Sequence, residues 1–259
     1  MQQIYPEPTA PLDHDALVGL YAYPASRGRA YVRANMVTSL DGAAQGTDGR
    51  SGTLSSPADK RVFAMLRGLA DVILVGAGTA RVEKYGPAEA EPGSAAHRAD
   101  LGQRPTPPIA VVSGRLALDL DGPLFEATGE RTIVLTSATA PRDRRDALSE
   151  KADVVVAGEN GVDLGLALGV LADRGLRRVL CEGGPRLLGE IVVDGLLDDL
   201  CLTFAPLLRG GDAPRALNSP SAPARGMRLA HVLEEEGTLF TRWLPSPGTV
   251  PQASADEED

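Results

Sequence analysis

The chain has 259 residues, with 26 Lys and Arg against 35 Asp and Glu, so its formal net charge is −9. This length is enough to bury a substantial core, as one large domain or two small ones. No basic stripe is visible and aromatic residues make up only 4%. These two features argue against a nucleic-acid surface, which needs cations for the phosphates and rings for stacking. A small anionic ligand held by a few cations remains compatible with the composition.

The cysteines and histidines show no pattern of a metal site. Cys181 and Cys201 lie in apolar stretches without CxxC spacing, so we expect two reduced core thiols and a cytoplasmic protein. His14, His97 and His231 are scattered over segments expected at the surface and lack ligand spacing. No leader pattern and no uncharged run of roughly 18 residues occurs, so neither secretion nor membrane insertion is expected.

The first third of the chain is expected to hold an arm, a strand and a helix. Residues 1–25 form the predicted N-terminal arm, which prolines keep extended and in which Asp13 caps a short helix. A strand is predicted over 30–37, followed by a Gly-rich loop to about residue 52. Serine and proline at 56–57 are typical of a helix start. The apolar residues of this helix fall on one face: Val62, Phe63, Leu66 and Leu69.

Short apolar runs then alternate with helical patterns along the rest of the chain. Strands are predicted at 72–76, 109–113, 132–137, 154–158, 179–181, 200–205 and 238–243. Helices are predicted at 142–151, 162–174 and 185–193. Residues 89–104 have no apolar period and are expected to be an exposed excursion. This alternation predicts one α/β domain over 26–244 with a mostly parallel sheet, followed by a disordered acidic tail at 245–259.

Three glycine-containing turns follow predicted strands, and such turns meet at the carboxyl edge of a parallel sheet, where ligands bind. In the third turn, Gly183 and Gly184 lack a Cβ that would block a close approach, and Pro185 suits the first helical position. Free amides at such a helix start attract phosphate. The second turn offers further amides and a hydroxyl, from Gly76, Gly78 and Thr79. Tight strand-to-helix packing is the alternative explanation for both turns.

Four segments of the chain are characteristic: NMVTSLDG, LSSPADK, ADVILVGAGTARVEKYG and CEGGPRLLGEIVVDGLLDDLCLTFAPLLRGG. Together they resemble the riboflavin-biosynthesis pyrimidine reductases, the reductase domain of the bifunctional deaminase-reductase, over roughly residues 31–243. The resemblance implies a three-layer α/β/α, dihydrofolate-reductase-like fold, NADPH as hydride donor and a homodimer. It also implies a substrate such as 5-amino-6-(5-phosphoribosylamino)uracil, whose ribosyl group is reduced to ribityl.

The resemblance also implies site residues. Cofactor contacts are expected from Val37, Thr38, Gly42, Gly76, Gly78, Thr79, Gly183, Gly184, Pro185, Arg186 and Leu187. Substrate contacts are expected from Ser51, Arg67 and Glu182, and the proton is expected from Asp41, Glu83 or Glu182. Ser113 and Arg115 follow a strand and suit the 2′-phosphate, because a hydroxyl and a guanidinium satisfy a dianion.

Several of these residues have structural alternatives. Asp41 either positions the ligands or hydrogen-bonds its own turn. Glu182 either binds a ligand or caps nearby backbone amides. Arg67 ends a helix, where a cation is stabilising by roughly 0.3–1 kcal/mol without any function. Glu83 and Lys84 also fit an exposed charge pair.

Two departures from the family pattern bear on the substrate. The segment from Glu83 to Pro87 lacks the arginine that the family motif carries for the substrate phosphate. Reduction of dihydrofolate or another pteridine therefore stays open, as does a nucleotide-binding protein without activity. No HxE with PCxxC motif of a zinc deaminase occurs, so only the reducing half of the bifunctional enzyme is predicted.

Overall fold

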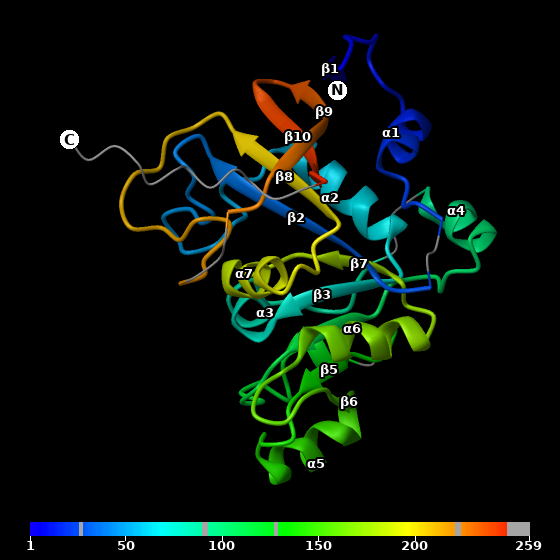
Figure 1. Ribbon diagram of the computed structural model, residues 1–259, viewed down its shortest axis with the longest axis vertical. Coiled ribbons are helices and arrows are strands. Elements are labelled where there is room, and N and C mark those ends of the chain that lie inside the picture. Colours follow the sequence, from blue (N-terminus) through cyan, green and yellow to red (C-terminus); the bar gives the residue numbers. More distant parts are fainter. Residues whose placement is uncertain (26–27, 90–92, 127–128, 221–223, 248–259) are drawn as a thin grey trace.

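The computed structural model describes residues 1–25, 28–89, 93–126, 129–220 and 224–247 (Figure 1). The strands are β1 (Gln2–Tyr5), β2 (Tyr31–Ser39), β3 (Val72–Gly76), β4 (Ile109–Val112), β5 (Ile133–Thr136), β6 (Asp153–Val156), β7 (Arg178–Cys181), β8 (Asp199–Ala205), β9 (Met227–Glu235) and β10 (Thr238–Pro245). The helices are α1 (His14–Tyr21), α2 (Pro57–Leu69), α3 (Ala77–Val82), α4 (Ser94–Asp100), α5 (Arg142–Lys151), α6 (Leu164–Asp173) and α7 (Pro185–Val193), with a 3-10 turn at Pro123–Phe125.

One ten-stranded sheet runs through the described residues in the order β1-β9-β10-β8-β2-β7-β3-β4-β5-β6. The seven strands from β8 to β6 are parallel to their neighbours, whereas β10, β9 and β1 extend one edge in antiparallel pairing. The predicted α/β class with a mostly parallel sheet is confirmed. Because seven strands point the same way, their carboxyl ends share one edge, and β2, β7 and β3 lie side by side there.

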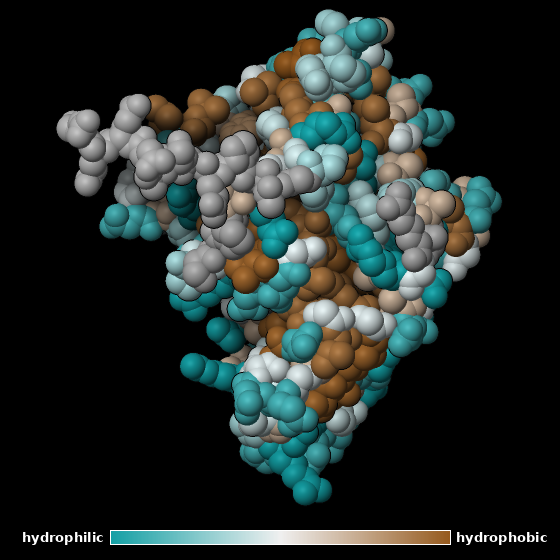
Figure 2. All heavy atoms as spheres, viewed as in Figure 1, coloured by the Kyte–Doolittle hydropathy of each residue, from teal (hydrophilic) through white to brown (hydrophobic). Residues whose placement is uncertain are grey.

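Helices cover both faces of the sheet and make three layers (Figure 1). Along β3, Val72 and Leu74 pack with α6 and α7, whereas Ile73 and Val75 face the side of α3 and α5. This alternation is the two-residue period of a strand buried on both faces. Helices α1 and α2 cover the antiparallel end of the second face. Figure 2 shows apolar side chains gathered over α6, where Leu166 is 57% exposed.

The span predicted as an exposed excursion, 89–104, contains helix α4, so that prediction is wrong for its described part; residues 90–92 lie outside the description. α4 packs on α2, and Arg98 is 1% exposed. Its guanidinium donates to the carbonyls of Gly68 and Ala70 at the end of α2, at 2.9 and 2.8 Å. A buried charge thus takes the place of the expected apolar period, because helix-end carbonyls accept hydrogen bonds from its Nη1 atom.

The predicted surface position of His231 is also wrong. It lies in β9, which the sequence reading missed, and is 4% exposed, with its ring edge-on to Tyr21 at 4.8 Å. Burial, reinforced by the charge of Arg242, lowers the pKa of His231 to about 4. The start of the N-terminal arm pairs as β1 with β9, and Asp13 caps α1 through the amide of Ala16.

Near His231, a buried ionic cluster joins strands β2, β8 and β10. Asp199 is fully buried, with Arg33 at 2.7 Å and Arg242 at 2.8 Å from its Oδ2 atom. The two guanidinium groups also donate to the carbonyls of Tyr21 and Leu20, at 2.6 Å each. The cluster therefore fixes the end of α1 to the sheet.

Of the predicted disordered tail, 245–259, residues 248–259 lie outside the described residues. Within the described ranges the helices are short, α2 being the longest at 13 residues, and none qualifies as a membrane span.

Candidate active site

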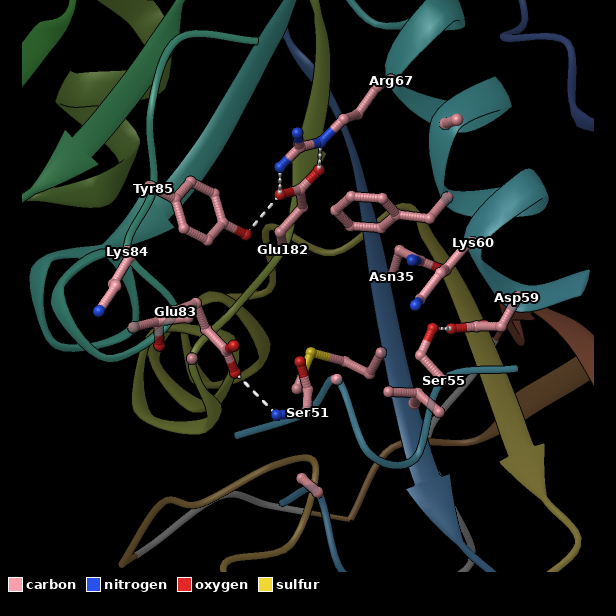
Figure 3. A pocket seen from close by; sticks show the side chains of 18 of the residues that line it. Asn35, Ser51, Ser55, Asp59, Lys60, Arg67, Glu83, Lys84, Tyr85 and Glu182 are labelled. Carbon is pink, nitrogen blue, oxygen red and sulfur yellow. Dashed lines mark hydrogen bonds and ion pairs between the residues drawn. The ribbon is translucent and has the colours of Figure 1, made fainter. Parts of the chain in front are cut away.

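A cavity of about 540 Å³ opens at the carboxyl edge of the sheet (Figure 3). Its walls come from the end of β2, the loop at 44–55, one face of α2, the segment 79–89 after β3, and the start of α7 after β7. Eight of the residues predicted for the site line it: Val37, Ser51, Arg67, Thr79, Glu83, Glu182, Gly184 and Pro185.

Glu182 forms the most constrained contact of the cavity. Its side chain is 2% exposed and receives two hydrogen bonds of 2.7 Å from the Nε and Nη2 atoms of Arg67. The hydroxyl of Tyr85 donates to the same carboxylate at 2.5 Å (Figure 3). Bidentate, charge-assisted pairing of this kind fixes both partners in direction. These three donors fix the carboxylate, which in turn orients the arginine.

The charges of this cluster move the pKa values of its neighbours. Burial opposes the charge of Arg67, but the Glu182 carboxylate outweighs it, so the pKa of Arg67 lies above its ordinary value. Burial, with the negative charge of Glu182, raises the pKa of Tyr85 well above its usual range. The arginine therefore stays charged and the phenol stays protonated at neutral pH. The guanidinium also lies over the ring of Phe63, at 4.3 Å from its centroid.

Helix α2 presents two different faces, which a four-residue spacing explains. Val62, Leu66 and Leu69 are buried in the core. Asp59, Phe63 and Arg67 follow each other at intervals of four residues and line the cavity. Phe63 was predicted on the core face with its apolar neighbours, and it instead forms part of the cavity wall.

Glu83 connects two walls of the cavity. It closes α3 at its carboxyl end, and its Oε1 atom accepts the backbone N–H of Ser51 at 2.8 Å. No hydrogen bond to its second carboxylate oxygen occurs within the described ranges. One oxygen thus holds the loop at 44–55, and the other remains available to a ligand.

The glycine turn after β7 is built for a close approach of backbone to ligand. Gly183 has φ +85°, and its carbonyl accepts the N–H of Gly76 at 2.8 Å. A Cβ placed on Gly184 would overlap Oγ1 of Thr79. Helix α7 then begins at Pro185 with no side-chain cap. Its first free amides therefore point out of the helix start, as a phosphate site requires.

The comparisons with known proteins agree with this geometry. A family model described as the RibD C-terminal domain matches residues 30–237. The chain belongs to this family. The resemblance to the riboflavin-biosynthesis pyrimidine reductases is thereby confirmed.

Two archaeal relatives carry the name 2,5-diamino-6-ribosylamino-4(3H)-pyrimidinone 5′-phosphate reductase. The protein of Methanothermobacter thermautotrophicus is 32% identical over 191 residues, which are 73% of this chain and 83% of the relative. The protein of Archaeoglobus fulgidus is 29% identical over 201 residues, 74% of this chain and 88% of the relative. A solved pyrimidine reductase-like protein of Corynebacterium diphtheriae superposes with a TM-score of 0.79 at 26% identity, covering 90% of this chain and 99% of that one.

Ten residues predicted for the site of this RibD C-terminal domain are not among the cavity-lining residues: Thr38, Asp41, Gly42, Gly76, Gly78, Ser113, Arg115, Gly183, Arg186 and Leu187. Asp41 accepts hydrogen bonds from the hydroxyl of Ser39 and the amides of Arg209 and Gly210, at 2.5, 3.0 and 2.7 Å. These bonds, that of Ser39 foremost, hold the pKa of Asp41 well below its usual range. The observed contacts match the alternative of a turn-stabilising aspartate.

Ser113 and Arg115 follow β4, beside β3 and on the same edge of the sheet as the cavity. Ser113 is 5% exposed, whereas Arg115 is exposed and forms no salt bridge within the described ranges. Gly76 and Gly78 flank the start of α3, and Arg186 and Leu187 form the first turn of α7. None of these residues is among those that line the cavity.

Several polar residues that line the cavity were not predicted for the site, among them Asn35, Asp59, Lys60 and Tyr85. Asp59 is 6% exposed, and burial raises its pKa, against the hydrogen bonds from Ser55 and Thr203. The four-residue spacing of Asp59 from Phe63 and Arg67 is a signal that the sequence carried. Asn35 and Tyr85 gave no such signal, because only the fold brings β2 and the segment after α3 to α2.

Proposed function

We propose that this RibD C-terminal domain is a reductase of riboflavin biosynthesis that uses NADPH to convert the ribosylamino group of a pyrimidine 5′-phosphate into a ribitylamino group. The observation that carries the proposal is the shared cavity of the glycine turn after β7 and the Glu182–Arg67 pair, in a chain whose archaeal relatives are named for this reaction. Protein groups supply binding and alignment, which account for a large part of such catalysis.

The residues present fit a pyridine dinucleotide. Glycine at position 184 leaves room for the hydroxyl of Thr79, which would have to shift if a Cβ were present, and the α7 start offers amides to a pyrophosphate. We assign the pyrophosphate to the amides of Arg186 and Leu187, the nicotinamide end to Val37 and Thr79, and the 2′-phosphate to Ser113 and Arg115. When bound, NADPH supplies a hydride from C4 of its nicotinamide.

The substrate phosphate needs cations that no other group already holds. Among the cavity-lining residues, the guanidinium of Arg67 is paired with Glu182, and Lys60 and Lys84 have no salt bridge within the described ranges. We therefore assign the 5′-phosphate to Lys84, which lies in the segment from Glu83 to Pro87 and takes the place of the arginine that this segment lacks. Ser51, Arg67 and Glu182 shape the wall against which the ribosylamino group lies.

The reaction consumes one proton in addition to the hydride. The open-chain imine of the ribosylamino group becomes an amine when its C1′ atom gains the hydride and its nitrogen gains the proton. Glu83 lines the cavity with an oxygen that receives no protein hydrogen bond among the described residues, which supports our assignment of the proton, or of a water that delivers it, to this residue. Glu182 orients Arg67 and Tyr85 instead, and Asp41 stabilises its turn.

The test is turnover by the purified chain. With NADPH and 2,5-diamino-6-ribosylamino-4(3H)-pyrimidinone 5′-phosphate or 5-amino-6-(5-phosphoribosylamino)uracil, we expect loss of nicotinamide absorbance and a ribityl product in the mass spectrum. Dihydrofolate serves as the comparison substrate. Turnover of dihydrofolate alone would replace the pyrimidine by a pteridine, and binding of NADPH without any turnover would indicate a protein that lacks the activity.

Cofactor preference and assembly complete the proposal. We expect NADPH to bind more tightly than NADH, and the Arg115→Ala variant to lose this preference, because our assignment pairs the guanidinium with the additional phosphate only. We also infer a homodimer that acts in the cytoplasm, where the buried thiols Cys181 and Cys201 stay reduced. Light scattering should give twice the chain mass of 27.0 kDa, and a mass of one chain would contradict the dimer.

A further inference from the structure

The proposed function leaves open which pyrimidine enters the cavity, and the two candidate rings differ at one position. One carries an amino group at C2 next to N3–H, and the uracil carries a carbonyl there. The first ring therefore presents two parallel donors on this edge, and the second presents one donor beside an acceptor. A protein group that hydrogen-bonds to this edge therefore cannot pair equally well with both rings.

Asp59 is a cavity-lining carboxylate that can accept more hydrogen bonds than the protein donates to it. Its side chain lies in the first turn of α2, is 6% exposed, and accepts the hydroxyl of Ser55 at 2.5 Å (Figure 3). The hydroxyl of Thr203 approaches it as a second donor. None of the salt bridges in the described ranges involves Asp59. Because a carboxylate accepts about four hydrogen bonds, two acceptor positions remain for a ligand.

The capping group of α2 is the hydroxyl of Ser56, and the Asp59 carboxylate lies in the first turn, where an anion also favours the helix start. Ser56 caps α2 by accepting the backbone N–H of Asp59 at 3.1 Å. A buried anion without a partner cation is costly unless donors satisfy it. The two hydroxyls satisfy Asp59 in part, and a ligand with paired N–H groups supplies the rest.

Phe63 forms an apolar part of the cavity wall near Asp59. It lies one helical turn after Asp59 and also lines the cavity, and its ring borders the guanidinium of Arg67. Positions four residues apart on a helix lie on one side. Because the Arg67 guanidinium already lies over the ring of Phe63, this residue supplies an apolar wall beside the Asp59 carboxylate, on the same side of α2.

We propose that Asp59 selects a substrate ring that keeps its 2-amino group, a 2-amino-4-oxopyrimidine, over the corresponding uracil. N3–H and the 2-amino group donate in parallel to the two carboxylate oxygens, as in other bidentate pairs. The uracil would instead set its C2 carbonyl oxygen against the anion. This inference rests on the proposed function, and it differs from the uracil substrate that the sequence motifs imply.

Steady-state kinetics of the full chain with each of the two pyrimidine phosphates tests the proposal. We expect kcat/KM for 2,5-diamino-6-ribosylamino-4(3H)-pyrimidinone 5′-phosphate to exceed that for 5-amino-6-(5-phosphoribosylamino)uracil by at least about 100-fold, since a site built for a donor rejects a ring that lacks it. The Asp59→Asn variant should lower this ratio at least about 10-fold, because its amide donates to the C2 carbonyl. Ser55→Ala, which keeps the charge of Asp59, should retain the preference.

Binding measurements separate this inference from the proposed function. Dissociation constants of both phosphates are measured by calorimetry with NADP⁺ present, and NADPH affinity and the urea midpoint show whether each variant is folded. Preferential binding of the 2-amino compound without turnover would sink the proposed function and leave the Asp59 assignment standing. Equal affinity of the native chain for both rings, or an equal loss for both rings in folded Asp59→Asn, would overturn the assignment.

Discussion

The pair of Arg67 and Glu182 gives a quantitative test of how the cavity wall is held. In the Glu182→Gln variant the two 2.7 Å charge-assisted bonds lose their anion, and the new amide turns a donor toward the guanidinium. Breaking a buried ion pair by removing one partner costs about 3–5 kcal/mol. Because the Arg67 side chain is 21% exposed, water partly solvates the unpaired guanidinium in the variant. We therefore expect the free energy of unfolding to fall by about 3 kcal/mol. For a chain of this size that loss lowers Tm by roughly 6–12 °C.

A double-mutant cycle isolates the pair from its surroundings. Urea titrations at pH 7 give the free energy of unfolding for the native chain, Glu182→Gln, Arg67→Met and the double variant. Since the two side chains touch, the double variant should lose less than the sum of the single losses, with a coupling energy of about 2 kcal/mol. A coupling energy below about 0.5 kcal/mol would show that the contact does not hold the wall, and the account of Glu182 as a positioning residue would then be refuted.

Three further predictions concern the rest of the molecule. Folding lowers the pKa of His231 from 6.5 to about 4, so on acidification the unfolded chain is protonated at this residue before the folded chain is. The free energy of unfolding should therefore fall by about 1 kcal/mol between pH 7 and pH 5.5. The His231→Phe variant should lose this part of the pH dependence in urea titrations, and an unchanged pH dependence would contradict the prediction. Asp199→Asn should cost about 3–5 kcal/mol of unfolding free energy, because two buried guanidinium groups lose their shared anion, and an unchanged urea midpoint would speak against that role. Gly184→Ala should weaken NADPH binding at least about 10-fold in calorimetry by displacing Thr79, and native affinity in this variant would reject the cofactor placement.

Local periodicity predicted most of the parallel sheet and its helices. The helices at 142–151 and 185–193 have the predicted bounds, and the apolar run at 72–76 is strand β3. These elements succeed because their side chains follow one rule, burial on one helical face or on both faces of a strand. The glycine turn at Gly183 and Gly184 was predictable for the same reason, since it depends on backbone shape and needs no distant partner.

The parts that the sequence did not predict depend on contacts between distant segments. Arg98 is buried in α4 only because the carbonyls at the end of α2 receive its protons, and no apolar pattern records that. His231 lies in β9, whose alternation is interrupted by charged residues at the antiparallel edge of the sheet. Asp59 carries a spacing signal toward Phe63, but its burial in a cavity follows from the positions of β2 and the segment after α3.

Transfer of an isotopic label tests the central claim most directly. The chain is supplied with NADPH that carries deuterium at the transferable position of nicotinamide C4, together with 2,5-diamino-6-ribosylamino-4(3H)-pyrimidinone 5′-phosphate. We expect one deuterium at C1′ of the ribityl product, found by mass spectrometry and assigned by NMR. Oxidation of the cofactor with no deuterium in the pyrimidine, or no product from either pyrimidine phosphate, would contradict the account.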